Sequence, residues 1–106
     1  MQVFNVKVST RGNVRTEPKT YHVPAHRQED FIYTIDPRNE DKYDLEEIDI
    51  QGTPFTQDRI NKKTIHVHDD NLMHYKHGDT NYKYTVFVKP VEGGESLVED
   101  PTIVNQ

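Results

Sequence analysis

The chain has 106 residues, a mass of 12.4 kDa and a formal net charge of -5 at pH 7. This length suits a single domain, residues 1–106, and the negative charge argues against a nucleic-acid partner, because phosphate binding needs a concentrated basic surface. The absence of cysteine excludes disulfides, thiolate catalysis and thiolate metal sites. No stretch approaches the roughly 18 apolar residues of a membrane span, so we expect no membrane association.

The start of the chain predicts one strand, a loop and an edge strand. Val3 to Val8 alternates at a period of two and places its even-numbered apolar residues on one face. The same alternation interrupts the apolar run that an export signal would need, so we expect no such signal. Ser9 to Pro18 contains turn-forming residues and predicts a turn or long loop. Tyr21 to Pro24 predicts a short strand at a sheet edge, because proline flanks it on both sides.

The middle of the chain predicts two more strands on either side of a turn. Phe31 to Ile35 is apolar in both alternating sets, so we expect a strand covered on both faces. Asp36 to Asn39, which includes a proline, predicts the turn. Leu45 and Ile48 are out of phase for one regular strand. A bulge at Glu46-Glu47 would restore a single inward face, and one helical turn is the alternative; we favour the bulge because the alternation continues after Ile48.

The second half of the chain is organised around the segment from Asn81 to Pro90, NYKYTVFVKP. Its tyrosines and valines fall on one face, so we expect a central strand that ends at the proline. Thr53 to Asn61 lacks clear periodicity and predicts a connection with some extended character. Thr64 to His68 predicts a strand. Leu72 to His77 predicts another, after a turn at Asp69-Asp70-Asn71.

The tail predicts a flexible turn at Glu92 to Glu95 and a last strand at Ile103-Val104. In all, seven or eight short strands recur at intervals of roughly 8 to 12 residues, with turn residues between them. This pattern predicts an all-β antiparallel β-sandwich with a thin core. Tyr82 resembles the tyrosine corner of Greek-key sandwiches, so we interpret Tyr82 and Tyr84 as core residues rather than as a platform for a ligand.

The sequence shows no signature of catalysis. Its 18 acidic side chains include Glu29-Asp30, Asp36 and Asp69-Asp70, which fall in predicted turns or at strand ends, where acids are solvated. Neither a nucleophile elbow nor a phosphate-binding loop is present, and neither Ser9 nor Ser96 lies beside a recognisable base. We therefore predict that the protein is not an enzyme.

The sharpest chemical pattern is IHVHDDNLMHYKH, from Ile65 to His77. His66 and His68 lie two apart on a predicted strand, so their side chains project to one face with Cα atoms roughly 6 to 7 Å apart. Two imidazoles at that spacing suit a shared Zn²⁺ or Cu²⁺, with His74 or another histidine or aspartate of this segment as a third ligand. The simpler interpretation, which we prefer, is the polar face of an exposed hairpin with no cofactor.

Three features of the chain are notable together: the closing sequence DPTIVN (Asp100 to Asn105), the tyrosine strand YKYTV (Tyr82 to Val86) and the alternating first strand. In these features the chain resembles the bacterial AidA/PixA inclusion-body proteins and their smaller relatives, the DP-EP family. The resemblance covers the whole chain, and its specificity rests mainly on DPTIVN and its distance from the tyrosine strand. It implies an immunoglobulin-like or cupredoxin-like β-sandwich in a bacterial cytoplasm. It implies no reaction and no catalytic residue. The chain is shorter than the typical AidA/PixA proteins, which favours the smaller DP-EP relatives.

These observations predict a non-enzymatic module for protein interaction or self-assembly, which forms a homo-oligomer or binds a protein partner through an edge strand. Tyr21 to Pro24 and Glu99 to Gln106 are the candidate edges. One alternative is a small-ligand binder, for example of carbohydrate; the other is a divalent-metal binder that uses His66 and His68. Six histidines that titrate near pH 6.5 would bring the charge of -5 close to zero in mild acid, where self-association becomes easier.

Overall fold

The computed structural model of the chain describes residues 1–50, 54–71 and 80–106. Within these residues the protein is all-β: it contains eleven strands and no α-helix, and no helix is long and apolar enough to cross a membrane. The strands are β1 (Gln2–Val8), β2 (Val14–Glu17), β3 (Thr20–Val23), β4 (Gln28–Ile35), β5 (Tyr43–Asp49), β6 (Phe55–Asn61), β7 (Thr64–Asp70), β8 (Thr80–Lys83), β9 (Thr85–Pro90), β10 (Leu97–Glu99) and β11 (Thr102–Asn105).

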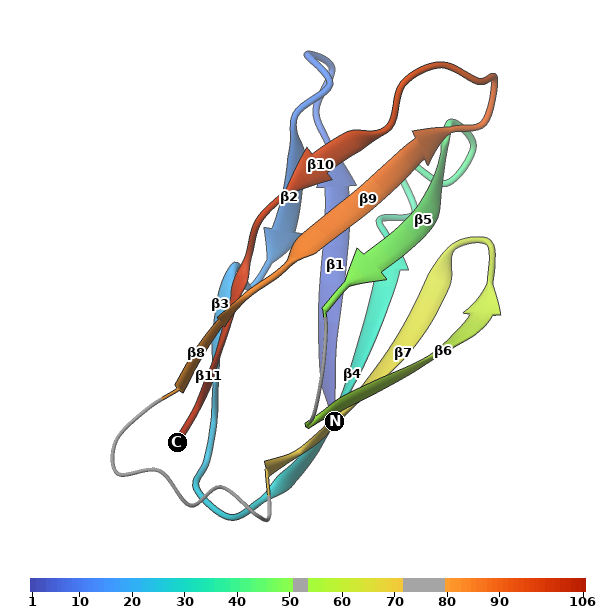
Figure 1. Ribbon diagram of the computed structural model, residues 1–106. Helices are drawn as coiled ribbons and strands as arrows, with labels where there is room; N and C mark the ends of the chain where they lie inside the picture. The colour runs from blue at the N-terminus through green and yellow to red at the C-terminus, as the bar shows by residue number, and fades with distance from the viewer. Residues whose placement is uncertain (51–53, 72–79) are drawn as a thin grey trace.

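One layer of the sandwich is a five-stranded sheet in the order β2-β1-β4-β7-β6 (Figure 1). β1 pairs with β4 in parallel, and the other three pairs are antiparallel. β4 and β7 therefore occupy interior positions, whereas β2 and β6 are the two edges. Interior strands with one inward and one outward face follow from the period-two alternation of their sequences.

The second layer is built from one long, bent hairpin. Its lower half pairs β8 with β11 and its upper half pairs β9 with β10 (Figure 1). β5 joins the upper half beside β9, and β3 joins the lower half beside β11. The bend falls between the halves, where Pro101 has no N–H to donate but its carbonyl accepts the Tyr84 N–H at 3.1 Å.

The core lies between the two layers and is made of Phe, Tyr, Val, Ile and Leu side chains. Phe4 stacks on Tyr33 with ring centroids 4.6 Å apart, and Phe31 meets Phe4 edge to face at 5.4 Å. The hydroxyls of Tyr33 and Tyr84 form a buried hydrogen bond of 2.6 Å between the layers. Each buried hydroxyl therefore has a partner, which offsets the cost of removing it from water.

Several predictions from the sequence are confirmed. The even-numbered apolar residues of β1 are buried, and β9 is the central strand of the sheet β10-β9-β5. The register of β5 against β9 shifts between Leu45 and Glu47, so the predicted bulge is present. β3 is an edge strand, and a last strand forms at Thr102–Asn105.

Other predictions were wrong, each for an identifiable reason. β2 lies inside the predicted loop from Ser9 to Pro18, because Ser9 and Gly12 close a tight turn that folds the chain back on β1. β6 lies inside the predicted connection from Thr53 to Asn61. It shows no apolar periodicity because Phe55 is its only buried residue. The tail is not an exposed edge, since β11 lies between β3 and β8.

The remaining differences concern the extent of strands and their burial. The segment from Asn81 to Pro90 divides at Tyr84 into β8 and β9, which pair in different sheets. The strand containing Phe31 to Ile35 buries one face only, because its other side chains lie on the outer face of the sheet. Asp69 and Asp70 end β7 rather than form a turn. The predicted strand at Leu72 to His77 lies outside the described residues.

Candidate functional site

His66 and His68 lie side by side on the outer face of the five-stranded sheet, as their spacing predicts. Ile65 and Val67 point into the core, so the two histidines point outward, each with about 30% of its side chain exposed. Both rings contact the same oxygen of Asp30 on β4. His66 Nε2 lies 2.9 Å and His68 Nδ1 lies 2.8 Å from Asp30 Oδ1.

The register of the sheet explains why these three side chains meet. Asp30 on β4 lies directly opposite His68 on β7, and Ile32 lies opposite His66. The hydrogen bonds from His68 and then His66 lower the pKa of Asp30 below its usual value. On the other side of β7, Asp58 Oδ2 of β6 lies 4.0 Å from His66 Nδ1. The cluster thus alternates carboxylate and imidazole groups across three strands.

The metal hypothesis stays a prediction. The structure brings His66 and His68 together, whereas His74 lies outside the described residues. In the part of the chain that the structure describes, no group of three or more His, Cys, Asp or Glu side chains is placed to hold a metal ion. One ring nitrogen of each histidine, His66 Nε2 and His68 Nδ1, is hydrogen-bonded to Asp30. Asp30 lies 36 residues before His66, so its part in the cluster follows only from the pairing of β4 with β7.

A second polar cluster is buried at the end of β7. Asp69 is fully buried, and its Oδ1 accepts a hydrogen bond of 3.0 Å from Asn105 Nδ2 on β11. Asn71, also buried, donates to the carbonyls of Pro24 and Gln106. Asp69 Oδ2 and the amide oxygens of both asparagines have no partner among the described residues. The sequence suggested a solvated Asp69, and the structure corrects this because its side chain shares the inward face of β7.

Burial dominates the electrostatics of this cluster. Removal from water raises the pKa of Asp69 from 3.8 to about 6, against the opposing effects of Asn105 and His68. Burial and the charge of Asp69 also raise the pKa of Tyr82, which belongs to β8. The folded state therefore binds a proton at Asp69 more readily than the unfolded chain does.

Asp36, which the sequence also suggested was solvated, is only 4% exposed. Asn5 Nδ2 donates to one carboxylate oxygen at 2.7 Å, and the Arg38 backbone N–H donates to the other at 2.9 Å. These hydrogen bonds, that of Asn5 above all, lower the pKa of Asp36 to about 2. The carboxylate ties the turn after β4 to β1, which is a structural role.

A surface groove of about 780 Å³ runs beside this turn and the β1–β2 hairpin. Its charged side chains largely pair with one another: Lys7 Nζ lies 3.0 Å from Glu17, and Arg38 Nε lies 3.3 Å from Asp36. The carboxylate of Glu99 accepts the Thr16 N–H and closes the side of the sandwich where β2 meets β10. Arg15 and Lys19 line the same groove without a carboxylate partner among the described residues. The groove thus mixes acidic and basic side chains and does not identify a ligand class.

The free edge of β6 is the other notable surface. The Pro54 carbonyl accepts the Asp70 N–H at 3.0 Å, which sets the alternation of hydrogen bonds between β6 and β7. In an antiparallel pair, every second residue bonds to the neighbour. Thr56 and Asp58 therefore bond to β7, while the backbone groups of Gln57 and Arg59 point the other way, where β6 has no neighbouring strand among the described residues.

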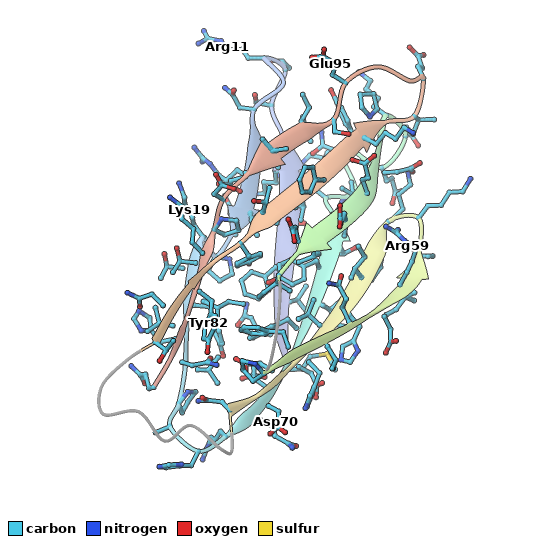
Figure 2. The ribbon with its side chains drawn as sticks, viewed as in Figure 1. Arg11, Lys19, Arg59, Asp70, Tyr82 and Glu95 are labelled. Carbon is cyan, nitrogen blue, oxygen red and sulfur yellow. The ribbon has the colours of Figure 1, made fainter. Side chains whose placement is uncertain are left out.

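Side chains from β6 close the gap to the second layer. Gln57 Nε2 donates to the Ile48 carbonyl of β5 at 2.9 Å, and the guanidinium of Arg59 donates to the Glu46 carbonyl. Figure 2 shows Arg59 at the side of the molecule where the β6–β7 hairpin lies near β5. These contacts satisfy carbonyls at the edge of β5, but they leave the outward backbone groups of β6 itself open.

Comparison with known proteins adds no family assignment: no family model matches the chain, and no curated protein matches it by sequence. The relationship to the AidA/PixA and DP-EP proteins therefore stays a prediction that rests on the residues quoted for it.

The metal hypothesis makes a direct prediction for thermal unfolding. If Zn²⁺ or Cu²⁺ binds, a free concentration 100 times Kd should stabilise the native chain by about 2.7 kcal/mol. The variant His66→Ala/His68→Ala should lose that stabilisation, and His22→Ala, which alters an exposed histidine of β3, should retain it. Thermal melts with and without metal measure the difference. Identical shifts in the three proteins, or no shift in any, would contradict the metal hypothesis.

The buried Asp69 predicts an unusual pH dependence of stability. Because the folded-state pKa of about 6 lies above the unfolded value of 3.8, this group favours folding below about pH 4, and the contribution is lost as the pH rises through 6. Asp69→Asn should therefore stabilise the protein at pH 7 by about 1 to 2 kcal/mol, with the gain disappearing near pH 4. Denaturant titrations at both pH values test this. A gain of the same size at pH 4 and pH 7 would contradict the assignment.

Proposed function

We propose that the chain is a non-enzymatic β-sandwich module that acts in protein interaction or self-assembly. The observation that carries this proposal is the exposed edge strand β6, in which six of seven residues are exposed. A strand edge with unpaired backbone groups is a template for pairing with another strand. The resemblance to the AidA/PixA and DP-EP families supports a bacterial cytoplasmic setting for the same proposal.

The edge strands of the sandwich differ in how well they are protected against pairing with another strand. β2 and β10 lie against each other, and the carbonyls of β5 are partly occupied by Gln57 and Arg59. β3 and β8 are the edges of the sheet β3-β11-β8, but each has only four residues. β6 is longer, with seven residues, and its outward groups have no neighbouring strand among the described residues. Of these edges, β6 therefore offers the longest surface for strand addition.

The charged groups described above support a structural role rather than catalysis. Asp36 is held by Asn5 and Arg38, Asp30 by two histidines, and Glu17 of the groove by Lys7. A general acid or base needs access to a substrate proton, and these acids are engaged in holding strands and turns together. The proposal therefore assigns them to the scaffold that presents the edge strand.

The mass of the native protein in solution tests the proposed function. We expect light scattering on a sizing column to give a mass above 12.4 kDa that rises across a roughly hundredfold concentration range. The net charge of -5 becomes smaller in magnitude in mild acid, so the rise should be larger at mildly acidic pH. A constant mass of one chain at both pH values would overturn self-assembly and leave a different protein as the only partner.

A further inference from the structure

We propose that two copies of the chain associate through β6, in an antiparallel pairing centred on Gln57, so that their five-stranded sheets join into one continuous sheet. The inference rests on the proposed function and makes it specific: it names the surface, the partner and the register. Its basis is the direction of the backbone groups along β6 and the placement of the charged side chains on the same strand.

The backbone of β6 limits how a second strand can pair. The N–H and C=O groups of Phe55, Gln57 and Arg59 alternate with those that bond to β7 and therefore point to the open side. In a symmetric antiparallel pair, these outward residues must lie opposite outward residues of the other copy. Side chains on the inner face then meet inner side chains, and outer side chains meet outer side chains.

Charge selects one register from those that the backbone permits. Centring the pair on Asp58 would place two copies of its carboxylate directly opposite each other, and centring it on Arg59 would oppose two guanidinium groups. Like charges directly opposite each other destabilise a pair of strands. Centring on Gln57 avoids both contacts, because it places Thr56 opposite Asp58 and Phe55 opposite Arg59. Centring on Thr56 would pair only residues 55–57 of β6, because the strand begins at Phe55.

The local charge of β6 suits a second copy of the same strand. β6 contains one acidic and one basic side chain, so it is neutral although the whole chain carries a net charge of -5. Beyond the paired segment, the bulge at Ile60, where the register against β7 shifts between Arg59 and Asn61, bends the strand. This bend limits the edge at one end. The pair is closed, rather than part of an extended filament, because both copies use the same edge.

A proline at position 57 tests the use of this edge. Gln57→Pro removes an outward N–H and leaves the hydrogen bonds between β6 and β7 in place, because Gln57 does not bond to β7 through its backbone. The matched control is Gln57→Ala, which loses the same side-chain contact to Ile48 but retains the N–H. We expect Gln57→Pro to weaken dimerisation at least tenfold and Gln57→Ala to dimerise as the native chain does. Thermal melts verify that both variants fold.

Cysteine substitution tests the register, and the absence of natural cysteines makes the result clear. In the proposed pair, two copies of Gln57 have Cα atoms about 5.5 Å apart, which lies within the range that a disulfide spans. Gln57→Cys should therefore form a cross-linked dimer in a glutathione redox buffer. Asp58→Cys should cross-link at least tenfold less, because its two copies are diagonal neighbours rather than directly opposed.

The outcomes separate this inference from the proposed function. A native dimer that Gln57→Pro weakens, with cross-linking at position 57, supports both. A native dimer unaffected by Gln57→Pro overturns the β6 assignment and leaves self-assembly standing. Preferential cross-linking at position 58 overturns the register. A native chain that stays monomeric throughout the concentration range overturns the inference together with self-assembly.

Discussion

The period-two alternation of β7 is the constraint on which the rest of the structure depends. Side chains at odd positions, Ile65 and Val67, fill the core, and those at even positions, His66 and His68, lie outside. The backbone alternates in the same way: the Lys63 carbonyl accepts the Ile35 N–H on the β4 side, and Asp70 donates to Pro54 on the β6 side. The alternation of β7 thereby determines which of its side chains enter the core, which form the histidine cluster and which backbone groups of β6 are left at the sheet edge.

This constraint also explains the polar groups that accompany the core. Asp69 lies two residues after Val67 on the same strand, so its side chain must also face inward. There Asn105 donates one hydrogen bond to it, and burial raises the pKa of Asp69 to about 6. Asp30, opposite His68, must face outward, where the two imidazoles lower its pKa. The pKa values of these two aspartates are thus shifted in opposite directions, because alternation places their side chains on opposite faces.

The same alternation determines which edge remains open. Residues of β6 that point their side chains inward, such as Gln57 and Arg59, use those side chains to bridge to β5. Their backbone groups must then point away from β7, and no neighbouring strand in the described part of the chain receives them. Charges, short strands and bulges commonly protect such edges. β6 has seven residues, two charges of opposite sign at Asp58 and Arg59, and a bulge only at its end.

The sequence predicted those parts of the fold that local patterns determine. The alternation in β1 and β7, the bulge near Glu47 and the edge position of β3 follow from residue types in a short window. β6 could not be recognised in this way, because an exposed edge strand needs no apolar periodicity. Strand order was equally inaccessible, so the sequence did not show that β11 lies between two neighbours.

The candidate site, too, was predictable only where local sequence patterns determine it. The shared face of His66 and His68 followed from their spacing, since strand geometry alone fixes it. Their contact with Asp30 depends on a pairing between distant segments that no local pattern encodes. The burial of Asp36 and Asp69 was missed for a related reason: acids at strand ends are usually solvated, and only the assembled layers show that these two are covered.

Native-state hydrogen exchange of the β6 amides is the most direct test of this account, measured residue by residue by NMR on dilute protein. We expect the protection to alternate: the amides of Thr56 and Asp58, which bond to β7, should exchange at least about a hundredfold more slowly than those of Gln57 and Arg59. Equal protection at all four positions would contradict the open edge. Fast exchange at all four would contradict the pairing of β6 with β7.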